Sequence, residues 1–197
     1  MVQVRPTVRA IGVIGAGKVG RGIALVAAMG GYRTILEDLL PHALRRAETE
    51  LRSQLDQAVE LGRISASAAN TFLSRLEFAG SVEDAARPAD LVIEAVPEEM
   101  ESKIEIFTLL DKICRPGAIL VSNLSSSSLS ITEIARVTYR SRNCLGMRFT
   151  NPVDPATRLE IIRGLETDDE TLATAVAVGK RMSKEVVVVK DEIAALP

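Results

Sequence analysis

The fold is decided by the segment 9–29, which reads RAIGVIGAGKVGRGIALVAAM. Its first residues form a short apolar run typical of a buried strand, and Ile23–Met29 continue as an apolar helix. Between them, Gly15, Gly17 and Gly20 form the pattern G-x-G-x-x-G. The first glycine makes a tight turn, the second lets the backbone approach a diphosphate, and the third lets helix pack on strand. The segment therefore predicts a strand–turn–helix unit that binds a dinucleotide, with the phosphates at the helix N-terminus.

The expected cofactor is NAD. The turn residues expected to line the diphosphate are Gly15, Gly17, Lys18, Val19 and Gly20. Asp38 ends the second expected strand, eighteen residues beyond Gly20. A carboxylate at this position accepts hydrogen bonds from the ribose hydroxyls and repels a 2′-phosphate, which favours NAD over NADP. Glu37 stands beside Asp38, but the alternation of a strand points it to the opposite face.

Short runs rich in Val and Ile alternate along the whole chain with stretches of helical period. We expect strands at 9–14, 34–38, 77–79, 90–95, 118–122, 143–147, 159–162 and 185–190. Helices are expected from Pro41 to Leu61, directly afterwards from Ala66 to Leu76, from a capping box at Ser130–Glu133, and over Thr171–Met182. The fold class is therefore α/β, a Rossmann-type doubly wound, mostly parallel sheet with a helical excursion after the second strand.

The overall composition is ordinary for a globular domain, with 197 residues, a formal net charge of −2 and 47% hydrophobic residues. Only 3% of the residues are aromatic and there is no basic excess, so a nucleic-acid surface is not expected. The longest apolar run, Ile23–Met29, is too short to span a bilayer, and no signal peptide is recognised. Cys114 and Cys144 are expected to be reduced, buried thiols rather than metal ligands, which indicates a cytoplasmic protein without a metal site.

Several stretches resemble, in order, the N-terminal NAD-binding domain of the 3-hydroxyacyl-CoA dehydrogenases. They are Val13–Ala24 (VIGAGKVGRGIA), Asp90–Glu98 (DLVIEAVPE), Ser128–Glu133 (SLSITE), Phe149–Pro152 (FTNP) and Val187–Asp191 (VVVKD). The resemblance covers nearly the whole chain. It implies a role in fatty acid metabolism and hydride transfer between NAD and a 3-hydroxyacyl thioester or a related hydroxy acid.

Carried over position by position, the resemblance implies that Asp38 binds the adenosine ribose and that Glu98 and Lys103 contact the cofactor. Ser127 and Asn151 match residues near the nicotinamide, and Ser127 also matches the serine that touches the substrate. The run Ser125–Ser128 carries about two extra residues relative to the family, so this serine is Ser127, Ser125 or Ser126. The alternatives are a capping loop without a ligand for the serine run, and a solvated, charged helix start for Glu98 and Lys103.

The largest departure from the family concerns its catalytic His–Glu pair. Glu160 matches the Glu, but the position of the His holds Arg148. The one histidine, His42, stands beside Pro41 at a helix start and is expected at the surface. A guanidinium does not lose its proton near neutral pH, and loss of a general base typically costs about 10²–10⁴ in rate. Arg148 is expected to pair with Glu160, and either to bind a carboxylate or polarise a carbonyl, or to form a structural ion pair in a disused pocket.

Two further departures concern the substrate and the second half of the family's fold. The CoA-contacting serine and lysine of the family are matched by Gln54 and Leu61, so the acyl group is expected on CoA, on a carrier protein or as a free acid. Residues 1–197 are expected to be one dinucleotide-binding domain, because the sequence stops where the family enters its C-terminal helical domain. A homodimer or a separate helical partner would then complete the site. The alternative function is an NAD-binding module with impaired catalysis, regulatory or one half of a split enzyme.

Overall fold

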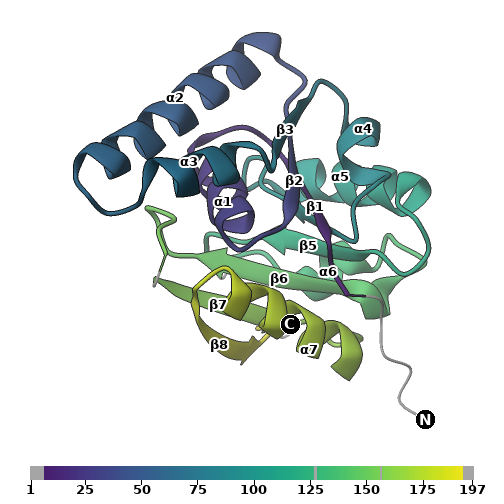
Figure 1. Ribbon diagram of the computed structural model, residues 1–197. Coiled ribbons are helices and arrows are strands. Elements are labelled where there is room, and N and C mark those ends of the chain that lie inside the picture. The colour runs from purple at the N-terminus through teal and green to yellow at the C-terminus, as the bar shows by residue number, and fades with distance from the viewer. Residues whose placement is uncertain (1–6, 127, 156, 193–197) are drawn as a thin grey trace.

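The computed structural model describes residues 7–126, 128–155 and 157–192, and an eight-stranded sheet forms its centre (Figure 1). The strands are β1 (Ala10–Ile14), β2 (Arg33–Glu37), β3 (Leu76–Ala79), β4 (Leu91–Glu94), β5 (Ile119–Asn123), β6 (Cys144–Phe149), β7 (Arg158–Arg163) and β8 (Glu185–Lys190). Their order is β3-β2-β1-β4-β5-β6-β7-β8, and every neighbouring pair is parallel except β6 and β7. The expected doubly wound, mostly parallel sheet is confirmed.

Helices cover both faces of this sheet (Figure 1). They are α1 (Lys18–Met29), α2 (Pro41–Glu60), α3 (Ala66–Leu73), α4 (Val82–Ala86), α5 (Met100–Ile113), α6 (Ile131–Ala135) and α7 (Asp169–Arg181), with a short 3₁₀ turn at Ser141–Asn143. Side chains of α1, α2 and α7 share one core cluster, and those of α4, α5 and α6 share the other. Every residue of β1, β4 and β5 is buried between the two layers, which explains why these strands are continuous apolar runs.

The helical excursion after β2 consists of α2 and α3, which lie together at one corner of the molecule (Figure 1). On α2, Ala47, Leu51 and Leu55 are buried, and Leu44 is partly buried against the core. Gly62, just past the end of α2, has a φ of +67°, a left-handed conformation that glycine adopts without a Cβ penalty. The expected helix from Pro41 is confirmed to within one residue of its end at Leu61.

The structure corrects two helix boundaries. The expected helix Ala66–Leu76 ends at Leu73, because Leu76 begins β3 and pairs with Thr34 of β2. The last helix begins at Asp169 rather than Thr171, and the Asp168 carboxylate accepts a hydrogen bond from Thr171 N at 2.7 Å. Tertiary pairing and capping therefore fix the element ends that hydrophobic spacing leaves open.

The predicted places of His42 and the two cysteines are confirmed. His42 is exposed, and Cys114 and Cys144 are buried free thiols. Burial raises the pKa of Cys114 to about 11 and that of Cys144 to about 12, so neither thiol ionises at neutral pH. Among the residues described, none of the helices is both long and apolar enough to cross a membrane.

Candidate cofactor and active site

The glycine turn between β1 and α1 has the geometry of a phosphate cradle. Gly15 has a φ of +101°, and a Cβ there would lie 2.9 Å from Ala95 O. A Cβ on Gly20 would lie 1.8 Å from Gly15 O, so no side chain fits at this position. Around Gly17, in contrast, a Cβ would meet nothing within 4 Å. The protein's own packing therefore requires the first and third glycines, whereas the second borders open space that a ligand can approach.

The N-terminus of α1 is free to bind an anion. The helix begins at Lys18, its N-cap Gly17 has no side chain, and its first turn holds no acidic residue. The unpaired backbone N–H groups and the helix dipole there favour a negatively charged group. Lys18 is exposed and Val19 is half-buried against the core. These residues fit the diphosphate of a dinucleotide, as the sequence predicts.

Asp38 lies at the same turn. One carboxylate oxygen accepts a hydrogen bond from Ala16 N, inside the glycine turn, and the other accepts one from Leu40 N, both at 3.0 Å. An ionised carboxylate has about four acceptor positions, so acceptor capacity for ribose hydroxyls remains. The structure thus joins the two halves of the motif that the sequence could only place eighteen residues apart.

Glu37, the neighbour of Asp38, is buried in the fold and only 2% exposed. Burial, together with the nearby charge of Asp38, raises the pKa of Glu37 to about 7. Its Oε1 atom has no hydrogen-bond partner among the described residues. The Glu37 side chain is therefore enclosed, whereas that of Asp38 binds Ala16 N and Leu40 N; the expected place of Glu37 on the opposite face of the strand stays a prediction.

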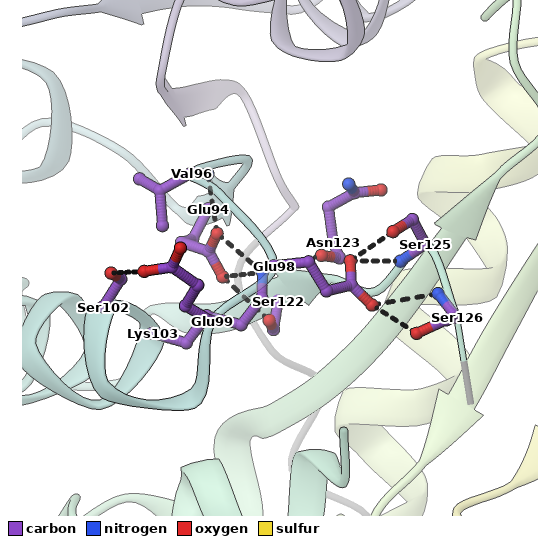
Figure 2. Close-up of polar contacts among 10 residues, drawn as sticks. All are labelled: Glu94, Val96, Glu98, Glu99, Ser102, Lys103, Ser122, Asn123, Ser125 and Ser126. Atoms are coloured by element: carbon purple, nitrogen blue, oxygen red, sulfur yellow. Dashed lines mark hydrogen bonds and ion pairs between the residues drawn. The ribbon is translucent and has the colours of Figure 1, made fainter. Parts of the chain in front are cut away.

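Glu98, expected to contact the cofactor, is surrounded by hydrogen-bond donors from the loop after β5. Oε2 accepts bonds from Ser125 N at 2.7 Å and from the Ser125 hydroxyl, and Oε1 accepts bonds from Ser126 N and Oγ, each at 2.9 Å (Figure 2). Partial burial alone would raise the pKa of Glu98, but these four hydrogen bonds outweigh it and lower the pKa. Glu98 is therefore an ionised carboxylate that binds two successive residues of the chain.

Lys103 lies inside the protein rather than along the site. Its side chain is 0% exposed, and its Nζ donates to both Glu94 oxygens at 2.9 and 3.0 Å and to Asn123 O at 2.9 Å. Desolvation raises the pKa of Glu94 even though Lys103 opposes the shift. All three ammonium donors of Lys103 thus bind groups of the protein, because a buried cation requires compensation from nearby acceptors. This arrangement differs from the cofactor contact expected for Lys103.

The Glu94–Lys103 pair connects the end of β4 and the helix α5 to the end of β5 (Figure 2). Glu94 also accepts hydrogen bonds from Val96 N at 2.7 Å and from Ser122 Oγ at 2.8 Å. The pair therefore fixes the loop after β4, which leads to Glu98, relative to the end of β5. The sequence analysis missed Glu94, although a carboxylate at the end of an apolar strand was a usable signal.

Arg148 forms the expected ion pair with Glu160, with 2.6 Å between Nη1 and Oε2. Two further guanidinium N–H groups donate to Leu124 O at 3.2 Å and to Ser126 O at 3.0 Å. The second carboxylate oxygen of Glu160 pairs with Arg158 at 2.8 Å. The predicted pair is confirmed, and Arg148 in addition binds the backbone of the serine run. The expected substrate-contacting serine, Ser127, lies outside the described residues.

Asn151, the remaining expected cofactor residue, is exposed and precedes Pro152 in the loop after β6. This loop borders a cavity of about 760 Å³ between α1 and α2. Cationic and polar side chains on its wall include Lys18, Arg21, Arg46, Gln54 and Arg63, with apolar groups between them. Leu61, matched to a CoA contact of the family, is exposed and is not part of this wall. The cavity therefore adjoins both the start of α1 and the expected nicotinamide end.

Lys184 supports the loop that carries Asn151, and the sequence analysis missed it. Its Nζ donates to Asp154 O and, at 2.9 Å, to Thr157 Oγ1, and the residue is only 6% exposed. Burial lowers the pKa of Lys184 to about 8. No local pattern marks this lysine, because its partners lie about 30 residues earlier in the chain.

The family model of the 3-hydroxyacyl-CoA dehydrogenase NAD binding domain matches residues 10–192. The chain belongs to this family. The resemblance of the sequence motifs is thereby confirmed, and NAD is the cofactor of the domain that residues 10–192 form.

Individual 3-hydroxyacyl-CoA dehydrogenase relatives agree with this membership. A probable 3-hydroxybutyryl-CoA dehydrogenase of Bacillus subtilis is 40% identical over 184 residues, which cover 93% of this chain and 63% of that protein. The crystal structure of (S)-3-hydroxybutyryl-CoA dehydrogenase from Ralstonia eutropha has a TM-score of 0.90 at 33% identity, covering 94% of this chain and 65% of that one. The enzyme from Escherichia coli also has a TM-score of 0.90 at 33% identity, over 94% of this chain and 39% of that one. The chain thus spans less than two thirds of the length of these relatives.

Proposed function

We propose that the protein is an NAD-dependent oxidoreductase that transfers hydride between NAD and the hydroxyl-bearing carbon of a 3-hydroxyacyl thioester or a related hydroxy acid. The observation that carries the proposal is the hydrogen bond between Ala16 N and Asp38, which unites the glycine turn with the ribose-binding carboxylate. In this arrangement Gly15–Gly20 hold the diphosphate and Asp38 holds the adenosine ribose. Bound NAD supplies the hydride acceptor, and Asn151 lies near its nicotinamide end.

The cavity between α1 and α2 supports an anionic acyl thioester as the substrate. Glu50 on its wall pairs with Arg21 and Arg46. Lys18 and Arg63 line the same cavity without a carboxylate partner in the part of the chain that the structure describes. Two free cations beside apolar walls suit a ligand that combines phosphates with an acyl chain. Gln54 on the same wall supplies an amide where the family has a CoA-contacting serine.

The proton transfer of this reaction needs a base other than Arg148. The guanidinium of Arg148 does not act as a base at neutral pH, and its N–H groups already bind Glu160, Leu124 O and Ser126 O. This observation favours a second candidate function, an NAD-binding module with impaired catalysis that works as a regulatory unit or with a separate helical partner.

Turnover distinguishes the two functions, because both require NAD binding. The purified chain is titrated with NADH by fluorescence and then assayed with NAD and 3-hydroxybutyryl-CoA, alone and with the isolated helical domain of a full-length relative. The oxidoreductase predicts NADH formation that depends on the thioester and is lost in Asp38→Ala. Tight NADH binding without turnover under either condition contradicts the oxidoreductase and supports the module.

A further inference from the structure

Two departures from the family that the sequence analysis expects meet at the proposed nicotinamide end. The resemblance implies about two extra residues around Ser125–Ser128 and places Arg148 where the family has its histidine. In the structure, Arg148 binds this same stretch of backbone. We call Leu124, Ser125 and Ser126 the serine turn, and its contacts join the loop after β5 to both Glu98 and β6.

The first contact of the serine turn is with the carboxylate of Glu98, whose hydrogen-bond acceptor positions the turn fills. Two backbone N–H groups and two hydroxyl groups, all from Ser125 and Ser126, donate to its two oxygens (Figure 2). An ionised carboxylate offers about four acceptor positions. With the turn in this position, Glu98 has no acceptor left for the hydroxyl groups of a ribose.

The second contact is the guanidinium of Arg148, which holds the serine turn from the other side. It donates to the carbonyl oxygens of Leu124 at 3.2 Å and of Ser126 at 3.0 Å, so it binds the turn at both ends. Glu160 orients the guanidinium through the 2.6 Å ion pair. Charge-assisted hydrogen bonds of this kind are stronger than neutral ones, which makes Arg148 the residue best placed to keep the turn against Glu98.

We propose that the serine turn and Arg148 determine how the chain binds the nicotinamide half of its cofactor. The closed turn occupies the acceptors of Glu98, so the nicotinamide ribose gains that carboxylate only when the turn releases it. The adenosine diphosphate half binds at the glycine turn and at Asp38, and the serine turn does not affect the binding of this half. The inference rests on the proposed NAD site and adds that NADH and ADP bind the wild-type chain with similar affinity.

The test compares the dissociation constants of NADH and ADP, which shares the adenosine diphosphate half but lacks both the nicotinamide and the ribose that carries it. For the wild-type chain we expect the two values to agree within about threefold, because the nicotinamide half adds little net binding while the turn is closed. The double variant Ser125→Ala/Ser126→Ala removes two of the four donors to Glu98. It is expected to bind NADH about tenfold more tightly with ADP binding unchanged, since hydrogen bonds to charged groups are strong.

Two matched pairs separate the effect of the turn from general effects of substitution. Ser102→Ala removes a serine of α5 that contacts Glu99 rather than Glu98, and it should leave both constants unchanged. Arg148→Met should tighten NADH as the serine variant does, whereas Arg158→Met, which removes the other partner of Glu160, should not. Thermal melting of each variant checks that the fold is intact.

The outcomes distinguish this inference from the proposed function. If the wild-type chain binds neither ligand, the NAD site itself is refuted and the inference fails with it. If it binds both, but NADH binds the serine and Arg148 variants no more tightly relative to ADP, only the inference is refuted. A wild-type preference for NADH of about a hundredfold over ADP would also overturn it, because the closed turn would then not withhold the carboxylate.

Discussion

The two ends of the proposed cofactor site are formed by different kinds of contact. At the proposed adenosine end, backbone conformation and one carboxylate, that of Asp38, form the site within the first 38 residues. At the proposed nicotinamide end, Glu98 and the serine turn come from two loops, Arg148 comes from strand β6, and side-chain hydrogen bonds hold them together. Local backbone geometry fixes the first end, whereas contacts between separate segments of the chain form the second. A few substitutions can therefore change function at the second end.

The same comparison explains where this chain departs from its family. The glycine turn tolerates no side chain at Gly15 or Gly20, because a Cβ there would collide with backbone. The extra residues expected in the loop after β5 find hydrogen-bond partners in Arg148 and Glu98. The expected departures from the family thus lie where side-chain hydrogen bonds can accommodate them.

The largest expected effect concerns the missing base. Arg148→His restores an imidazole beside Glu160, and turnover of 3-hydroxybutyryl-CoA should rise by about 10²–10⁴-fold, the usual contribution of a general base. The measurement is NADH formation as a function of pH, which should gain an inflection near the pKa of histidine. Arg148→Met is the control, because it also removes the guanidinium but supplies no base. An unchanged rate in Arg148→His would show that proton transfer is not what limits this chain.

The second prediction concerns the buried pair beneath the nicotinamide end. Lys103→Met leaves the Glu94 carboxylate enclosed without its cation, and the free energy of unfolding should fall by about 3–5 kcal/mol. Urea unfolding at pH 7 measures the change. Lys112→Met, an exposed lysine on the same helix, should stay within about 0.5 kcal/mol of the wild type. A loss in Lys103→Met no larger than that of the control would mean that the pair is hydrated in solution.

The third prediction concerns the adenosine end. Asp38→Asn keeps the size of the side chain but removes its charge, and NADH binding should weaken by about 10–100-fold, the value of a hydrogen bond to a charged group. NADPH binding should weaken less, because the carboxylate that repels the 2′-phosphate is gone. Fluorescence titration with both dinucleotides provides the test. Equal losses for NADH and NADPH would contradict a ribose contact by Asp38.

The smallest expected effect is a pH dependence of stability from Glu37. Its pKa of about 7 in the folded protein lies above the usual value of 4.5, so the folded state binds more protons between these values. The free energy of unfolding should therefore fall as pH rises from 4.5 through 7, by about 1–2 kcal/mol after allowance for relaxation of the site. Glu37→Gln should remove this slope in urea unfolding from pH 5 to 8.

Glu77→Gln serves as the comparison for Glu37 on the neighbouring strand. The hydrogen bond from Arg33 lowers the pKa of Glu77, so this carboxylate stays ionised throughout pH 5–8. Its substitution should leave the slope unchanged. Equal slopes in the wild type and in Glu37→Gln would mean that Glu37 is ionised in the folded protein at all of these pH values.

The adenosine end could be predicted nearly completely from the sequence. The turn, its helix and Asp38 follow from residue types at fixed spacings, and the structure brings them together at 3.0 Å. At the other end the sequence predicted the Arg148–Glu160 pair but not the hydrogen bonds from Ser125 and Ser126 to Glu98. It also gave Lys103 a ligand contact, whereas the structure commits its ammonium group to Glu94 and Asn123 O.

The sequence by itself determined the alternation of strands and helices, the doubly wound, mostly parallel sheet and the dinucleotide turn. These features depend on the period of apolar residues and on glycine conformations, which are properties of neighbouring residues. Only the tertiary structure decided which donors reach Glu98, what Arg148 binds, and which of two adjacent carboxylates, Glu37 or Asp38, is enclosed. The first two outcomes depend on contacts between segments 12 to 28 residues apart in the chain, and a shift of one residue in a loop exchanges one hydrogen-bond partner for another.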